Sequence, residues 1–153
     1  MKCWVHDGRL YVEREAVRVG LELDDTATFV VNCIPGFDRE ISRWDCSRPE
    51  SISHLTRHGL PRAVACEKWA GSVEDGISYL RSFAEIIVHP RCTSVASETR
   101  LYSYKVDRLS GDVTSNIVDA HNHTIDAIRY ALGPMIRHRS KPVTKSKPLR
   151  GLY

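Results

Sequence analysis

Segments with the pattern of strands alternate with segments with the pattern of helices along most of this chain, and this alternation limits the fold more than any other feature. Short apolar runs lie at residues 41–45, 63–67 and 85–90. Each precedes a stretch that reads as a helix, at residues 49–58, 72–81 and 93–104. Such alternation is typical of an α/β fold, in which helices cover the faces of a sheet.

The first third of the chain adds a hairpin and a further helix. Residues 2–19 predict two strands joined at Asp7-Gly8, because Asp-Gly between alternating apolar residues is a strong turn signal. Residues 23–32 favour a helix, although the β-branched pair Val30-Val31 argues against it. An antiparallel hairpin is therefore expected to precede the alternating part.

The helix predicted at 72–81 has a recognisable start. Ser72 can cap it, with Asp75 three residues later in a near capping box, and Val73, Ile77 and Leu80 are expected to face the core. The last helix is expected to begin near Asp119 and to end near Gly133-Pro134.

The last predicted helix combines a polar face with an apolar one. Asp119, His123 and Asp126 recur at helical spacing and share one face, and a second face consists of Ile125, Ile128 and Leu132. Two carboxylates and an imidazole can bring ligands for Mg²⁺ or Mn²⁺ into a site. Asp119 can equally serve as the N-cap of the helix.

Asp45 follows a predicted strand directly and precedes a predicted helix. In open α/β sheets, ligand-binding groups gather outside such strand ends. An aspartate at this position can also cap the helix that follows, so the pattern alone leaves both interpretations open.

Several separate motifs, in order along the chain, resemble one family. They are Asp45-Cys-Ser-Arg-Pro-Glu-Ser-Ile52, Glu67-Lys-Trp-Ala-Gly-Ser-Val-Glu-Asp-Gly-Ile77, His89-Pro-Arg-Cys92, Tyr104-Lys-Val-Asp107 and Asn122-His-Thr-Ile-Asp-Ala-Ile-Arg-Tyr-Ala-Leu132. Together they resemble the C-terminal nuclease domain of the large terminase subunit of tailed bacteriophages, in the branch typified by a defective Bacillus prophage. The resemblance extends from about residue 2 to about residue 132.

The resemblance implies an RNase H-like mixed sheet flanked by helices. It also implies an endonuclease that cuts concatemeric viral DNA with acidic residues and two Mg²⁺ or Mn²⁺ ions. Asp45 and Asp126 match the family's acidic positions, and His123 lies where the family can carry a metal-binding or proton-transferring histidine. Each of the three has a structural alternative as a capping or surface residue.

The implied partners are double-stranded DNA, a terminase small subunit and a portal, in the cytosol of a bacterial host. Lys68, Lys105 and Arg129 are expected to contact DNA, and so are Arg100 and Arg108. Each of these can instead be an ordinary surface charge. Trp69 is expected in the core, with stacking on DNA as the alternative.

The family's domain opens with a strand that carries a first catalytic aspartate. Here the first residues match the second strand, so the fold is expected to lack that first strand, and Asp7 belongs to the hairpin turn. The chain is therefore expected to be either part of a metal-dependent nuclease or an inactive prophage remnant that only binds DNA or assembles. A different RNase H-like nuclease, such as a resolvase, is a weaker third possibility.

Composition is compatible with this. A chain of 153 residues with 42% hydrophobic residues suits one soluble domain, expected at 1–134. The absence of a long apolar run and of a signal peptide indicates no membrane association. The five cysteines include no Cys-x-x-Cys pair, which argues against a zinc ribbon or disulfide framework.

The charge is distributed unevenly. From Ala127 to the C-terminus there are seven Lys or Arg and no Asp or Glu, whereas all nineteen acidic residues precede Ala127. We expect residues 135–153 to form a basic, flexible tail that either contacts phosphates or is only solvated. No P-loop motif occurs, so the chain is expected to lack the packaging ATPase.

Overall fold

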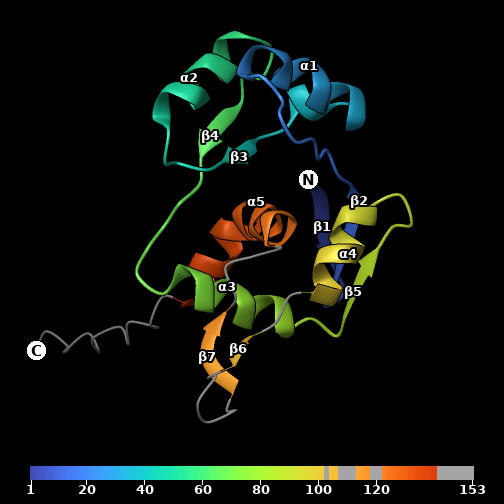
Figure 1. Ribbon diagram of the computed structural model, residues 1–153, viewed down its shortest axis with the longest axis vertical. Coiled ribbons are helices and arrows are strands. Elements are labelled where there is room, and N and C mark those ends of the chain that lie inside the picture. The colour runs from blue at the N-terminus through green and yellow to red at the C-terminus, as the bar shows by residue number, and fades with distance from the viewer. Residues whose placement is uncertain (102–103, 107–112, 118–121, 141–153) are drawn as a thin grey trace, which may run out of the picture.

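The computed structural model describes residues 1–101, 104–106, 113–117 and 122–140. Strands and helices alternate as predicted, in a mixed α/β fold (Figure 1). In chain order the elements are β1 (Lys2–His6), β2 (Arg9–Arg14), α1 (Leu23–Cys33), the 3-10 helix η1 (Phe37–Arg39), β3 (Ser42–Trp44), α2 (Pro49–Arg57), β4 (Ala63–Ala65), α3 (Ser72–Arg81), β5 (Glu85–Val88), α4 (Thr93–Leu101), β6 (Tyr104–Val106), β7 (Val113–Ile117) and α5 (His123–Ser140).

The predicted hairpin is confirmed. β1 and β2 pair antiparallel, and the turn between them places Asp7 at φ 48° and Gly8 at φ 69°. Positive φ at both turn residues matches the right-handed twist of the strands, which explains why Asp-Gly was informative. β5 then adds in parallel to β2, which makes a mixed three-stranded sheet in the order β1-β2-β5.

A second, smaller unit contains α1, α2 and the parallel pair β3-β4, at the top of Figure 1. The core cluster of this unit consists of Ala27, Leu55, Leu60 and Ala63. Because β3 and β4 run parallel, their C-terminal ends lie side by side, and the residues that follow them emerge at the same end of the pair.

The main core lies between the three-stranded sheet and helices α3, α4 and α5. α5 crosses the middle of the molecule and contacts α3, α4 and β3, so it joins the two units (Figure 1). Its predicted apolar face is confirmed, since Ile125, Ile128 and Leu132 are all buried in this core. The polar side of α5 is thereby held in place by the packing of the opposite side.

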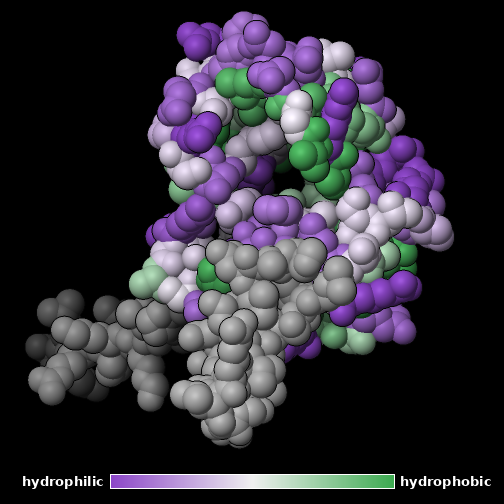
Figure 2. All heavy atoms as spheres, in the orientation of Figure 1, coloured by the Kyte–Doolittle hydropathy of each residue, from purple (hydrophilic) through white to green (hydrophobic). Residues whose placement is uncertain are grey.

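A groove of about 470 Å³ lies between the two units. The outer edges of β1 and β3 face no strand among the described residues, because β1 pairs with β2 and β3 with β4. Residues of β1, η1 and β3, together with Ala131 of α5, line the groove. Figure 2 shows the molecule hollowed between the upper and lower units.

The start of α3 differs from the prediction. Its N-cap is Gly71, at φ 82°, and no side chain in the described part of the chain caps the helix; Ser72 is already its first residue. Val73 is 41% exposed, whereas Ile77 and Leu80 are buried as expected. Gly71 adopts a left-handed conformation that glycine allows without strain, and this shifts the helix by one residue relative to a serine cap.

α5 does not end near Gly133-Pro134 but continues through Pro134 to Ser140. Three contacts hold the turns beyond the proline. Ile136 is buried in the main core, Arg137 pairs with Glu67, and Arg139 donates a hydrogen bond to the Ser82 hydroxyl. Packing thus offsets the backbone hydrogen bond that a proline removes inside a helix.

α4 ends at Leu101, three residues before the expected end, and β6 begins at Tyr104. The expected turn at 109–112 and the residues Asp107, Arg108 and Asp119 lie outside the described residues. In the described part of the chain, no helix combines the length and apolar character needed to cross a membrane.

Candidate functional site

Asp45 follows β3 directly, at the end of the strand pair where β4 also ends. The backbone N–H of Cys66 donates a hydrogen bond to the Trp44 carbonyl at 2.7 Å and so extends the pairing of the two strands. Asp45 Oδ1 accepts the N–H of Ser47 at 3.0 Å. α2 has Arg48 as its N-cap, and no described side chain caps it, so Asp45 turns the loop rather than capping the helix.

Lys68, three residues after β4, reaches this carboxylate. Its Nζ lies 2.7 Å from Asp45 Oδ1, and both side chains are about half exposed. The hydrogen bond from Lys68 is the main reason that the pKa of Asp45 lies below its usual value. The same contact raises the pKa of Lys68. The site therefore holds an ionised carboxylate beside the positively charged ammonium group of Lys68.

Asp126 projects from the first turn of α5 and is partly exposed. Arg129 lies one turn later, with Nη2 3.3 Å from Asp126 Oδ1. The Arg129 side chain is only 6% exposed, and its Nε and Nη1 find no hydrogen-bond partner among the described residues. Arg129 thus neutralises Asp126 from inside the protein. Arg129 itself therefore has little exposed surface for the DNA contact expected from the sequence.

Tyr130 of α5 lies beside Lys68, the partner of Asp45. The Nζ of Lys68 lies 5.6 Å from the centroid of the Tyr130 ring. Burial is the main cause that raises the pKa of the Tyr130 phenol, and the charges of Asp126 and Asp45 raise it further. Both aspartates therefore lie near enough to one phenol to act on its charge.

A pocket of about 240 Å³ opens beside these groups. It is lined by the segment that carries Lys68 and Trp69 and by the face of α5 that carries Asp126, Arg129 and Tyr130. Trp69 is partly buried against the main core, and its Nε1 donates to Asp75 at 2.7 Å. Trp69 thus packs against the core as expected but also borders this pocket, and stacking on DNA stays a prediction.

His123 is the first residue of α5 and is exposed. The neighbouring Thr124 is buried, and its N–H and hydroxyl both donate to Glu98 of α4 at 2.7 Å. Glu98 therefore caps α5 and fixes the direction in which His123 and Asp126 leave the helix. Sequence reasoning missed this cap, because Glu98 and Thr124 are distant in the sequence.

The remaining basic residues fall into three groups. Arg100 of α4 is exposed. Lys105 belongs to β6, but its side chain is outside the described residues, as is Arg108. Arg137 and Arg139, expected in a free tail, instead contact Glu67 and Ser82 from the end of α5.

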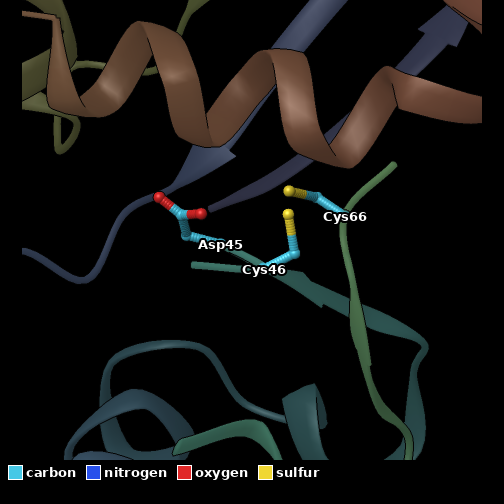
Figure 3. Close-up of side chains that lie close together, drawn as sticks. All are labelled: Asp45, Cys46 and Cys66. Atoms are coloured by element: carbon cyan, nitrogen blue, oxygen red, sulfur yellow. The ribbon is translucent and has the colours of Figure 1, made fainter. Parts of the chain in front are cut away.

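The donor set suits a hard divalent cation. Asp45 and Asp126 supply carboxylate oxygens, which Mg²⁺ and Mn²⁺ prefer. Both also have a basic partner, Lys68 or Arg129, that neutralises them without a cation. A different set is formed by one carboxylate oxygen of Asp45 and the sulfur atoms of Cys46 and Cys66, all within 4.8 Å of one another (Figure 3).

Comparison with known proteins gives consistent results. Residues 4–133 match the model of the terminase RNase H-like domain family. The large terminase subunit of Bacillus phage SPP1 is 35% identical over 133 residues, which are 84% of this chain and 31% of that protein. The chain thus spans about a third of the length of this relative.

A solved structure has the same fold. It is the crystal structure of the nuclease domain of the large terminase from bacteriophage SPP1 with bound Mn. The similarity has a TM-score of 0.76 at 33% sequence identity and covers 84% of this chain and 72% of that one.

Proposed function

Because the chain belongs to the terminase RNase H-like domain family, we propose that it is the nuclease part of a phage DNA-packaging terminase. In this role it hydrolyses phosphodiester bonds of concatemeric double-stranded viral DNA with Mg²⁺ or Mn²⁺. The small subunit of the terminase and the portal would be its partners in the cytosol of the bacterial host. The observation that carries the proposal is that Lys68, which pairs with Asp45 at 2.7 Å, lines one pocket together with Asp126 and Tyr130 of the distant helix α5.

Asp45 and Asp126 would hold the cation, and His123 would either add a ligand or carry a proton at the exposed end of α5. When bound, a pair of divalent ions would supply an activated water and stabilise the leaving oxygen. Tyr130 remains protonated, because burial and the nearby carboxylates raise its pKa. Its hydroxyl can therefore donate a hydrogen bond to a phosphate oxygen.

Lys68 has two uses in this proposal. Without a cation, its ammonium group neutralises Asp45 at 2.7 Å. With a cation on Asp45, the two positive charges repel, and the half-exposed Lys68 is free to turn toward a DNA phosphate. Lys68 is thus a better candidate for the DNA contact than the buried Arg129.

We also propose that the nuclease needs one more strand, placed between β1 and β3. The edges of both strands are unpaired among the described residues, and a groove lies between them. A strand here would run beside the start of β1 and beside β3, which leads directly to Asp45. A carboxylate on that strand would complete the ligand set.

The second candidate function is a DNA-binding or assembly module without nuclease activity. The pairing of each aspartate with a basic residue favours it for the 153-residue chain alone, since neither carboxylate needs a cation for charge balance.

Nicking of supercoiled plasmid in Mn²⁺ or Mg²⁺ tests both candidates. We expect the 153-residue chain to be weakly active or inactive. A chain extended upstream by an aspartate-bearing strand should cut, and Asp126→Asn or Asp45→Asn in that longer chain should abolish the cutting.

Asp25→Asn is the matched control, because it removes an exposed carboxylate that lies on α1, away from the candidate site. Brisk cutting by the short chain that survives Asp126→Asn would contradict both the site and the need for another strand. Failure of every extended chain to cut, with DNA binding intact, would favour the assembly module.

A further inference from the structure

Two cysteines that are twenty residues apart meet beside Asp45. Cys46 follows β3 and is half-buried, and Cys66 follows β4 and is buried. The parallel pairing of the two strands, continued by the hydrogen bond from Cys66 N–H to the Trp44 carbonyl, brings their sulfur atoms together. Figure 3 shows both sulfur atoms and the Asp45 carboxylate directed into one space between β3 and α5.

This arrangement has the size of a small metal site. In a tetrahedral zinc site with metal–sulfur distances of about 2.3 Å and metal–oxygen distances of about 2.0 Å, ligand atoms lie about 3.5 to 3.8 Å apart. Here the three candidate atoms lie within 4.8 Å of one another. Side-chain rotations that move each ligand atom by less than about 1 Å would therefore close the site around an ion.

We propose that Cys46, Cys66 and Asp45 form a binding site for a thiophilic divalent cation such as Zn²⁺. Thiolate ligands select soft or borderline cations, whereas Mg²⁺ and Mn²⁺ prefer oxygen. On binding, each thiol releases its proton to solvent as its sulfur bonds to the metal. Three protein ligands leave a fourth position for water.

Charge and access both support the site. Two thiolates and one carboxylate exceed the charge of a divalent cation by one negative charge, and the Lys68 ammonium beside Asp45 neutralises it. Asp45 and Lys68 are 49% and 44% exposed, so an ion can arrive from solvent. Among the described residues, no other group of three such ligands lies together.

The site shares Asp45 with the proposed nuclease and therefore implies regulation, an implication that rests on the proposed function. A thiophilic ion held by the two cysteines would occupy a carboxylate that the hard cation needs. Zn²⁺ would then inhibit Mn²⁺-dependent cleavage through Cys46 and Cys66, and Mn²⁺ itself would not fill the cysteine site.

Binding is tested without reference to activity. Co²⁺ or Cd²⁺ is added to the reduced 153-residue chain, and thiolate-to-metal charge-transfer absorption is recorded with the stoichiometry. We expect one ion per chain and displacement of Co²⁺ by Zn²⁺. Cys46→Ser and Cys66→Ser should each weaken binding by at least about tenfold, and Asp45→Asn should weaken it less.

Cys33→Ser is the matched control, since Cys33 is a half-buried free cysteine on α1, and it should leave binding unchanged. Circular dichroism checks that each variant folds, and Cys66→Ala provides a second variant if Cys66→Ser does not. No charge-transfer absorption, or absorption that survives both cysteine variants, would overturn the proposal. So would a mass lower by two hydrogen atoms without bound metal, which would mean that dissolved oxygen had taken two electrons and two protons from the thiol pair to give a disulfide.

The regulatory part has its own readout in the extended, cutting chain. Zn²⁺ inhibition that Cys46→Ser relieves supports the shared use of Asp45, and inhibition unaffected by the variant overturns that part. If no chain cuts DNA, the proposed function fails while the charge-transfer result still decides the metal site.

Discussion

At the residue scale, Lys68 sets the state of Asp45. Its ammonium group contacts the Asp45 carboxylate that a bound cation would also contact, and it lies over the aromatic ring of Tyr130. Both members of the pair are about half exposed, so solvent screens the attraction and the pair adds little to stability. The importance of the contact is therefore in binding rather than in folding.

Replacing Lys68 by methionine should reveal this balance. The pKa of Asp45 is lowered in the folded chain by Lys68, so the pair stabilises the protein above the ordinary carboxyl pKa and loses its effect as pH falls through the folded value. We expect Lys68→Met to reduce the unfolding free energy by less than about 1 kcal/mol near neutral pH. Urea unfolding near neutral pH and near about pH 2.5 measures the difference, which should close in acid. A difference that persists in acid would point to packing of the Lys68 stem instead.

At the element scale, α3 and α5 meet closely at Gly76. A Cβ at this position would lie 2.7 Å from Cδ of Arg129, and both residues are buried. Gly76 is thus the notch in α3 that accommodates the guanidinium stem, which in turn brings Arg129 to Asp126.

Gly76→Ala should therefore destabilise the protein, although alanine favours helix over glycine. Overpacking of a buried contact costs about 1–3 kcal/mol, which exceeds the gain in helix propensity of about 1 kcal/mol. Gly133→Ala in α5 is the control, because its Cβ would meet nothing within 4 Å. Thermal unfolding of both variants measures the effect, and a more stable Gly76→Ala protein would show that Arg129 can move aside.

Two glutamates cap helices from other elements. Glu15, just after β2, accepts the N–H groups of Ser94 and Val95 at the start of α4. Glu98 within α4 then accepts the N–H and the hydroxyl of Thr124 at the start of α5. The orientation of α5, and with it that of Asp126, thus depends on contacts that begin at the hairpin.

Glu98→Ala should loosen the start of α5. Loss of an N-cap costs about 0.5–2 kcal/mol, and amide hydrogen exchange should quicken at Thr124 and Ile125 more than at Leu132. Glu74→Ala on α3 provides a control at an exposed acidic residue near a helix start. Equal exchange in the two variants would show that packing alone holds α5.

Local signals in the sequence predicted the elements, whereas contacts between distant residues made the site. Asp7-Gly8 and the spacing of Ile125, Ile128 and Leu132 are local, and both predictions are confirmed. The pairing of Lys68 with Asp45 and the approach of Cys46 to Cys66 depend on the register of β3 and β4, which no local pattern contains. The continuation of α5 past Pro134 depends in the same way on the burial of Ile136.

At the scale of the whole molecule, charge is separated along the chain. The acidic residues of the candidate site precede Ala127, and Lys141, Lys145, Lys147 and Arg150 follow the last described helix. Since Arg137 and Arg139 contact the folded domain, these four are the residues of the basic C-terminal segment from which we expect contacts with DNA phosphates, in addition to Lys68.

Deleting residues 141–153 should make DNA binding less sensitive to salt. Each lost phosphate contact lowers the slope of log affinity against log salt by about 0.9, and base preference should not change. A chain of full length with the four basic residues replaced by Gln controls for length and should behave like the deletion. A slope unchanged in both variants would leave the tail without a role in binding DNA.

Among the described residues the outer edges of β1 and β3 pair with no strand, and we expect this to affect the chain at high concentration. Each edge presents a row of backbone N–H and C=O groups that can pair with an extended segment of another molecule. Two such rows facing one groove favour exchange of segments between copies. Concentrated preparations of the 153-residue chain are therefore expected to accumulate β-rich aggregates. An added strand that pairs with β1 and β3 should slow this accumulation.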